Sequence, residues 1–459
     1  MNDLEKILST SFLVPMGDPR DEKCVWGLNM MLWGPPGIGK SERIENAGAM
    51  VGLPVRPTYI PTCQPEDASG APFANATKGL AMMESILFTL EEYLEDSEGN
   101  LDTEATWAEL GLNRLMGVHR EKSFNFVPKV IKNMVRAARR YGPAFSRIEP
   151  TLPGVSDLIA DGEGVWFLDE ISSARPAVQG GFLGAVLARR IGGVKLPPRI
   201  RVVAAGNPAS SAAGGWDMEP PMANRWCHID TGIPTTKEFD NWLNDRSEYQ
   251  FESIENGQQR VIDNWPGEWA TVRGVVSGYL ATKPALHELP PEGNPDRGRA
   301  WMSPRTFNFA LRAWTTCRCL GYDDVFAMKL IQGCIGEAAT TKLAKWVTEA
   351  DLPKPLDVLN NGWVVDKKRL DRCMAVYSSI TNYVIECSDP NEQVELAIKA
   401  WKRLEESASA NLFDLSVQHA QTLIRAKLNS AHKTRGSELA EASRPVLMRA
   451  VKSGVHLVA

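Results

Sequence analysis

The sequence predicts an α/β protein, with a parallel sheet in the first half of the chain and mostly helices in the second. Three short, strongly apolar runs each end in a glycine-rich or polar loop, which is typical of buried parallel strands. A helical stretch and then a further strand follow the first run, which gives the order strand, helix, strand. Beyond Ile233 strand signals become rare, and periodic segments rich in tryptophan continue to about residue 450.

The first strand–helix–strand unit is expected between residues 28 and 61. The run Leu28–Trp33 (LNMMLW) stops at a Gly-Pro-Pro sequence, and Ser41–Met50 is then expected to form a helix. Val55–Pro61 predicts the second strand, and a polar, turn-rich loop is expected at 64–72. This order places a glycine-rich loop between a buried strand and a helix.

Two later strands end in polar side chains. Val165–Leu168 (VWFL) runs into an acidic pair, and Ile200–Ala205 (IRVVAA) ends at Gly-Asn-Pro. In open α/β sheets, ligands bind outside the carboxyl ends of the strands. We therefore expect these ends and the loop after Trp33 to form one shared site.

Composition and charge limit the classes of function. The chain has 459 residues, enough for about three domains, and a net charge of −5, so it has no global positive field for nucleic acid. No stretch approaches the roughly 20 apolar residues of a membrane span, and the N-terminus lacks a signal-peptide pattern, so we expect a cytoplasmic protein that does not cross a membrane. The eight cysteines include no CxxC pair, which argues against a disulfide framework and a zinc site.

A helical segment at 78–147 is split by charge. Residues 82–113 hold nine carboxylates and no Lys or Arg, whereas 114–147 hold a single acid, Glu121. One interpretation is a pair of solvated helices that attract one another, and the other is a basic element that faces a ligand or partner. The basic residues are Arg114, Arg120, Lys122, Lys129, Lys132, Arg136, Arg139, Arg140 and Arg147.

The loop after the first strand matches the phosphate-binding pattern G-x-x-x-x-G-K-[ST]. Its glycines allow backbone N–H groups to turn toward a phosphate, and the following helix adds the positive end of its dipole. The lysine is expected to reach the β- and γ-phosphates of ATP, and the serine hydroxyl to ligate Mg²⁺. The predicted nucleotide-binding residues are Gly34, Pro35, Pro36, Gly37, Ile38, Gly39, Lys40 and Ser41.

The other two strand ends supply the remaining polar groups of the predicted site. Asp169 can hold Mg²⁺ and Glu170 can activate a water molecule; the alternative is that this pair caps the N-terminus of a helix. Asn207 is placed to orient the attacking water or to touch the γ-phosphate; the alternative is a turn-forming Asn-Pro.

In their order along the chain, these motifs resemble those of AAA+ ATPases. GPPGIGKS, VWFLDEIS and RVVAAGNP are similar to Walker A, Walker B and sensor 1, while ANRWCHID and MSPRTF resemble the arginine-finger and sensor 2 motifs. The stretch from RPAVQGG to AAGNP looks like the MoxR branch of the helix-2 insert clade, where a helix and a hairpin lead into sensor 1. DLPKPLDVLNNGW at 351–363 is similar to a lid segment of that branch.

The resemblance implies a P-loop AAA+ core over 1–235, a helical lid over 236–345 and a helical C-terminal extension over 346–459. The long separation of Lys40 from Asp169 makes 78–147 an insertion, at the place where the clade carries its extra element. The motif after the acidic pair is ISSARP where many relatives carry Asn-Arg, which leaves the roles of Ser173 and Arg175 open.

The resemblance also implies a site completed between subunits. Arg225 would be a finger that reaches the γ-phosphate held by a neighbouring subunit, and Arg305 a lid residue that closes over the same nucleotide. The alternatives are a surface salt bridge for Arg225 and an exposed first-turn residue for Arg305. The family further implies a homo-oligomer, with a hexameric ring as the expected form, and a protein partner with a von Willebrand A domain.

These features favour an oligomeric Mg²⁺-dependent ATPase that remodels a protein partner. A nucleic-acid-dependent motor that uses the basic segment 114–147 is the alternative. A third hypothesis is a nucleotide-gated scaffold that hydrolyses ATP too slowly to matter, and the intact Glu170 counts against it. Trp226, Cys227 and His228 are expected to pack in the core rather than to form a nucleophilic pair.

Overall fold

The computed structural model describes most of the chain outside one long internal segment and several shorter ones. The described residues are 3–65, 67, 155–191, 194–208, 216, 218–236, 252–282, 286–409, 412–426 and 435–453. The predicted insertion 78–147 and most of the predicted loop 64–72 lie outside them. The chain divides into two compact units: Met1–Pro61, Glu163–Pro176 and Pro198–Ala459 form the first, and Thr62–Gly162 and Ala177–Pro197 form the second.

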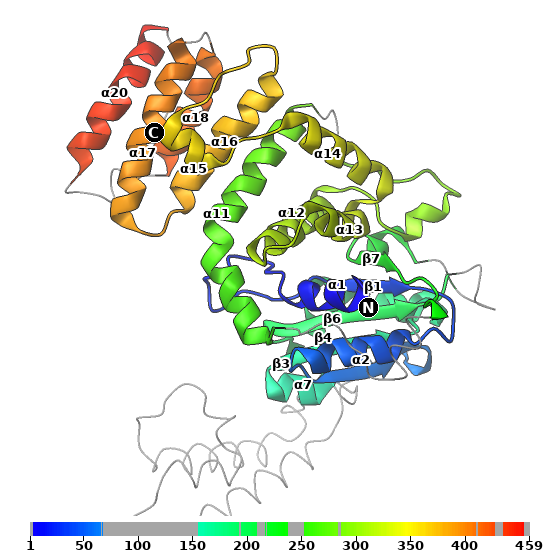
Figure 1. Cartoon of the computed structure of the whole chain (residues 1–459). Helices are drawn as coiled ribbons and strands as arrows, with labels where there is room; N and C mark the ends of the chain where they lie inside the picture. Colours follow the sequence, from blue (N-terminus) through cyan, green and yellow to red (C-terminus); the bar gives the residue numbers. More distant parts are fainter. Residues whose placement is uncertain are drawn as a thin grey trace, which may run out of the picture. The chain divides into compact units, whose positions relative to one another are not determined.

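A five-stranded parallel sheet forms the α/β part of the first unit (Figure 1). Its registers pair Trp33 with Gly206 and with Asp230, and Tyr59 with Asp169, so the carboxyl ends of the strands meet at one edge. The predicted α/β fold with a parallel sheet is therefore confirmed. In spatial order the strands are β2 (Val55–Tyr59), β3 (Glu163–Asp169), β6 (Arg199–Gly206), β1 (Met30–Trp33) and β7 (Cys227–Asp230).

The predicted strands are present, with shifted ends, and the sheet contains one strand that the sequence did not predict. β1 begins at Met30 rather than at Leu28, and β2 stops at Tyr59, where the 3₁₀ turn η1 (Ile60–Thr62) begins. β7 is only four residues long and contains Cys227 and His228, so it has no apolar run to mark it. Its strand conformation depends on pairing with β1, which is information that a local pattern does not carry.

Two helices of the α/β part stand close to the glycine-rich loop. α2 (Lys40–Met50) begins directly after this loop, and the N-terminal residues form α1 (Asp3–Phe12), a helix that was not predicted. The two helices are joined by an ion pair in which Arg43 Nε and Nη2 donate to the buried carboxylate of Glu5, at 2.9 and 3.1 Å. This bidentate pair fixes the N-terminal helix beside the helix that follows the loop.

The second half of the described chain is helical, as predicted: beyond Asp230 the described residues contain no strand. One apolar cluster joins the sheet to helices as far along the chain as Ala375, and a second one lies within residues 358–446. The boundary between lid and extension near residue 345 remains a prediction. The helices are α9 (Pro220–Ala223), α11 (Ile254–Ala281), α12 (Pro304–Cys319), α13 (Asp324–Ile335), α14 (Glu337–Ala350), α15 (Pro355–Asn361), α16 (Leu370–Glu386), α17 (Pro390–Ser409), α18 (Phe413–Arg425) and α20 (Gly436–Lys452), with the 3₁₀ turn η5 (Pro295–Gly298).

The long helix α11 packs closely against α16. A Cβ placed on Gly274 would lie 1.8 Å from the Oγ of Ser379, and one on Gly278 would lie 2.5 Å from the Cβ of Ala375. Glycine at these two positions therefore allows the two backbones to approach, while other residue types would force them apart.

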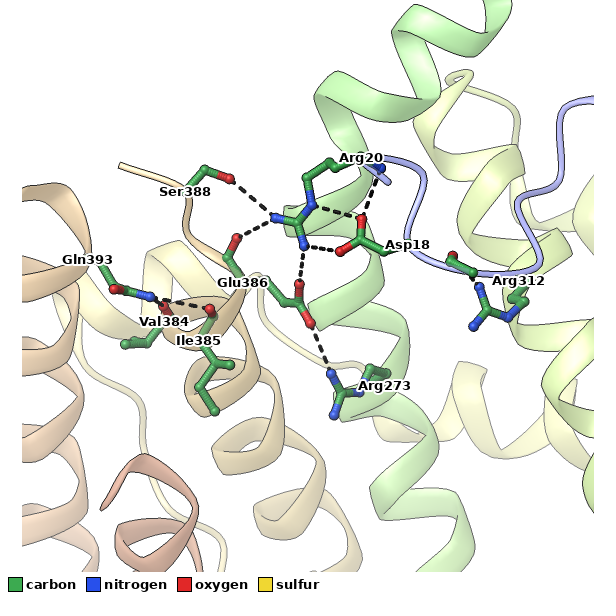
Figure 2. Close-up of polar contacts among 10 residues, drawn as sticks. Asp18, Arg20, Arg273, Arg312, Val384, Ile385, Glu386, Ser388 and Gln393 are labelled. Atoms are coloured by element: carbon green, nitrogen blue, oxygen red, sulfur yellow. Dashed lines mark hydrogen bonds and ion pairs between the residues drawn. The ribbon is translucent and has the colours of Figure 1, made fainter. Parts of the chain in front are cut away.

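An ion-pair network ties the N-terminal segment to this helix pair (Figure 2). The carboxylate of Glu386 accepts hydrogen bonds from Arg20 Nη2 and from Arg273 Nη1, both at 3.1 Å. Arg20 also makes a bidentate pair with Asp18, at 2.9 and 2.7 Å. The network connects the segment between α1 and β1 with α11 and with the end of α16 (Figure 2).

The second unit contains helices and a small hairpin in its described part. α7 (Val155–Asp161) precedes the sheet strand β3, and most of α8 (Pro176–Ala188) belongs to this unit. Strands β4 (Arg190–Ile191) and β5 (Val194–Lys195) pair antiparallel. The helix and hairpin expected before Asn207 are thus present.

None of the described helices combines the length with the apolar composition that a transmembrane helix requires.

Candidate functional site

The glycine-rich loop leaves the carboxyl end of β1 with its backbone in conformations that favour glycine. Gly37 and Gly39 have φ values of 81° and 78°. A Cβ on Gly34 would lie 2.3 Å from Thr231 Oγ1 and 2.9 Å from the carbonyl oxygen of Thr231. Within the described part of the chain, no backbone hydrogen bond starts from the N–H groups of residues 37–41. The loop therefore fits a phosphate, which several aligned N–H groups can bind.

Lys40 is held at this loop by three hydrogen bonds. Its Nζ donates to the carbonyl oxygens of Gly34 and Pro35, at 2.8 and 3.0 Å, and to Oδ1 of Asn207 at 2.7 Å. The residue is 8% exposed. Burial lowers the pKa of Lys40, and the negative charges of Glu170 and Asp169 oppose that shift. The ammonium group is thus fixed at the carboxyl edge of the sheet.

Ser41 and Asp169 are brought together, as the sequence predicted for a Mg²⁺ site. The Ser41 hydroxyl donates to Oδ2 of Asp169 at 3.1 Å. Burial raises the pKa of Asp169, the Ser41 hydrogen bond lowers it, and the neighbouring charge of Glu170 raises it.

The donor set at this point is small. Among the described residues, no group of three or more His, Cys, Asp or Glu side chains could hold a metal ion by itself. One hydroxyl and one carboxylate beside a phosphate cradle nevertheless fit Mg²⁺, which takes few protein ligands and completes its shell with phosphate oxygens and water.

Glu170 has an unusual backbone conformation. Its φ of 56° and ψ of 37° lie in the left-handed region, and it precedes the 3₁₀ turn η4 (Ile171–Ser173). The side chain caps no N–H group of this turn. Its carboxylate accepts instead from Asn207 Nδ2, at 2.8 Å to each oxygen, and from Ser173 Oγ at 2.7 Å. The alternative interpretation of Glu170 as a helix cap is therefore wrong.

Asn207 links the phosphate loop to the acidic pair. It follows β6, which lies between β1 and β3, so its side chain is placed between Lys40 and Glu170. Its backbone is fixed by Ser172, whose Oγ accepts from the Asn207 N–H at 2.9 Å and donates to the Asn207 carbonyl at 3.1 Å. Asn207 is 7% exposed. Its side-chain Oδ1 accepts from Lys40, and its Nδ2 donates to Glu170. Its role toward water or phosphate remains a prediction.

The two predicted arginines lie near one another, and among the described residues neither is bonded to this cluster. Arg225 is only 9% exposed, and its Nη1 donates to the carbonyl of Pro221. Burial lowers the pKa of Arg225, and the positive charge of Arg305 lowers it further. The alternative of a surface salt bridge for Arg225 is therefore wrong, because the side chain is buried and has no ion pair among the described residues.

Arg305 is exposed in the first turn of α12, which begins with the capping box of Ser303 and Thr306. Within the described residues, no hydrogen bond or ion pair joins Arg225 or Arg305 to Lys40, Asp169 or Glu170. Arg175 is exposed next to the site, and its role stays open.

Trp226, Cys227 and His228 are buried, as predicted for core residues. Trp33 Nε1 donates to Nδ1 of His228 at 2.8 Å, and Nε2 of His228 lies 2.9 Å from the carbonyl oxygen of Ala223. This pattern fits the neutral ring with its proton on Nε2. Burial lowers the pKa of His228 to about 4. Among the described residues, the ring of His228 is hydrogen-bonded to Trp33 and Ala223 and to no thiol that it could activate.

A cavity of 1280 Å³ lies beside the carboxyl end of β7. Thr231 lines it, and the same residue donates its N–H and its hydroxyl to the carbonyl of Trp33, at 2.6 and 2.8 Å. Its apolar wall comes from distant parts of the chain, which explains why no local motif predicted it. The apolar side chains include Leu4, Ile7, Ile229, Ile335 and Ala339.

No family model and no curated protein matches this chain. Among solved structures, that of a "putative ATPase" from Cytophaga hutchinsonii is similar over 75% of this chain and 88% of that chain, with 11% sequence identity and a TM-score of 0.40. A likeness at this level carries no weight for function, so the assignment below rests on the geometry of the site.

Proposed function

We propose that the chain is a Mg²⁺-dependent ATPase of the AAA+ type. The observation that carries the proposal is the chain of hydrogen bonds from Lys40 through Asn207 to Glu170, beside the contact between Ser41 and Asp169. A phosphate cradle, a fixed ammonium, two ligands that suit Mg²⁺ and a carboxylate meet at one edge of the sheet. This is the set of groups that phosphoryl transfer to water requires.

The proposed roles follow from the chemistry of each group. The loop N–H groups and Lys40 bind the β- and γ-phosphates, while Ser41 and Asp169 hold Mg²⁺. When bound, Mg²⁺ neutralises charge on the phosphate oxygens. Glu170 accepts a proton from a water molecule whose oxygen bonds to the γ-phosphorus, while the bond from phosphorus to the bridging oxygen breaks and ADP leaves.

Asn207 would couple phosphate binding to the carboxylate. All three hydrogens of the Lys40 ammonium have acceptors within the protein, and one acceptor is Asn207 Oδ1. A phosphate oxygen is the stronger acceptor because it is charged. It therefore replaces the amide oxygen, after which Asn207 can turn its Nδ2 from Glu170 toward the phosphate or the water.

The cavity beside β7 is the proposed site of the nucleoside. Its wall combines apolar side chains with residues of the segment from Ile229 to Pro234 and with polar residues such as Gln332 and Thr341, which suits a flat heterocycle and a ribose. Thr231 joins this wall to the loop at Gly34, so base and phosphates could be bound side by side.

Arg225 and Arg305 are proposed to act between subunits of a homo-oligomer, expected to be a hexameric ring. Within the described chain they make no hydrogen bond or ion pair with Lys40, Asp169 or Glu170, and the buried Nε of Arg225 has no hydrogen-bond partner among the described residues. The resemblance of the motifs supports the finer assignment: a MoxR-like ATPase in the cytoplasm that remodels a partner with a von Willebrand A domain.

Subunit mixing tests the proposed sharing of the site. Arg225→Ala removes the finger and leaves Glu170 intact, whereas Glu170→Gln does the reverse. Each variant alone should lose at least about 100-fold in ATP turnover. Mixed assemblies should recover a clear fraction of the wild-type rate, because some sites then carry both intact residues. Full turnover by Arg225→Ala alone would contradict the role of this arginine.

A further inference from the structure

The residue of interest is Ser173, which directly contacts the carboxylate of the proposed general base. Its Oγ donates to Oε2 of Glu170 at 2.7 Å. The sequence left its role open, and the nucleotide site described above does not use it.

The local backbone explains why this serine reaches the carboxylate. Residues 171–173 form a 3₁₀ turn, and the Ser173 N–H donates to the Glu170 carbonyl at 2.9 Å. In a 3₁₀ turn, side chains three residues apart lie on the same face. The backbone of Glu170 is in the left-handed region, with a φ of 56°. The side chain of Glu170 is turned toward the face of the turn that carries Ser173. A hydroxyl at position 173 is therefore held within reach of the carboxylate.

The hydrogen bonds make the two carboxylate oxygens unequal. Oε2 accepts from Ser173 Oγ and from Asn207 Nδ2, whereas Oε1 accepts from Asn207 Nδ2 alone. Each oxygen has two lone pairs in the carboxylate plane. Among the described residues, Oε2 is thus saturated and Oε1 keeps one open acceptor position.

We propose that Ser173 is a positioning residue that makes Oε1 the oxygen that receives the proton of the attacking water. Because Ser173 occupies one position on Oε2 whether or not Asn207 also donates there, Oε1 is the more open oxygen for a water molecule to donate to. The serine also restrains rotation of the carboxylate, which would otherwise present either oxygen. This inference rests on the proposed ATPase function.

Ser173→Ala is the test, with Ser173→Thr as the conservative variant and Ser277→Ala as a matched control. Ser277 is a half-buried serine on α11 that donates only to its own helix, at the carbonyl of Arg273. We expect Ser173→Ala to lower kcat about tenfold, since a general base depends on orientation, while KM and the Kd for a fluorescent ATP analogue stay within about twofold. Ser173→Thr retains the hydroxyl and should keep most of the wild-type kcat.

A second comparison separates positioning from a structural effect. If Ser173 acts through the carboxylate, Ser173→Ala should change the single-turnover rate of a Glu170→Gln protein by less than about twofold. An unchanged kcat in Ser173→Ala would overturn the inference. So would a loss of nucleotide affinity, or an equal loss of rate in the Glu170→Gln background. If the wild-type chain itself shows no Mg²⁺-dependent turnover, the ATPase proposal fails first, and that result is distinct from these.

Discussion

His419 is expected to make the helical bundle sensitive to acid. This residue on α18 is 4% exposed, and its Nδ1 lies 3.2 Å from Thr381 Oγ1. Its Nε2 is buried without a hydrogen-bond partner among the described residues. Burial lowers the pKa of His419 from 6.5 to about 4. The folded protein therefore holds this ring neutral at pH values where the unfolded chain protonates it.

The sign and size of the change in the free energy of unfolding follow from the difference between the pKa values of His419 in the folded and unfolded states. As pH falls below about 6.5, His419 binds a proton in the unfolded state but stays neutral in the folded state. The free energy of unfolding therefore decreases. With pKa values of 6.5 unfolded and about 4 folded, the loss between pH 7.5 and 5.0 is about 2 kcal/mol. The loss levels off below about pH 4, where the folded state also binds the proton.

The assay is urea unfolding of the wild type and of His419→Gln at pH 7.5 and at pH 5.0. Other titrating groups affect both proteins alike, so the difference between their pH dependences isolates His419. We expect the variant to lose about 2 kcal/mol less than the wild type over this interval. The same loss in both proteins would refute the assignment of a neutral buried ring.

Three further predictions concern the loop, the site and the ion-pair network. Gly34→Ala should weaken ATP binding more than tenfold, because the new Cβ would lie 2.3 Å from Thr231 Oγ1; Gly180→Ala, with nothing within 4 Å, is the control. Asn207→Asp should lower kcat about 100-fold in a steady-state ATPase assay, because it places an oxygen instead of a donor 2.8 Å from Glu170; unchanged turnover would contradict the link. Glu386→Gln should cost about 1 kcal/mol in urea unfolding at low salt and less in 1 M salt, and an effect that salt leaves unchanged would argue against an ionic origin.

The sheet and most of the site could be predicted because their signals are local. Buried parallel strands such as β3 are short apolar runs, and the glycine-rich loop must lie between a strand and a helix to bind phosphate. Once these strands are parallel neighbours, the side chains at their carboxyl ends must meet. Lys40, Asp169 and Asn207 were placed in this way, and the hydrogen bonds show Lys40 in contact with Asn207 and Asp169 in contact with Ser41.

Other features depend on tertiary contacts that no local pattern records. β7 is a strand because it pairs with β1, and the cavity wall is assembled from α1, α13 and α14. The contact of Ser173 with Glu170 depends on the left-handed backbone conformation of Glu170. This conformation is uncommon for residues other than glycine, so the sequence does not predict it. The burial of Arg225 likewise comes from packing around α9 and was not predicted.

Glu170 is proposed to act as the base at a site that binds ATP and Mg²⁺. The direct measurement is steady-state ATP turnover of the wild type and of Glu170→Gln with and without Mg²⁺, together with their Kd for ATP. We expect turnover that needs Mg²⁺, and a Glu170→Gln protein that binds ATP with similar affinity while its kcat falls at least about 100-fold. Full turnover by Glu170→Gln, or a wild-type chain that binds no ATP, would contradict the proposal.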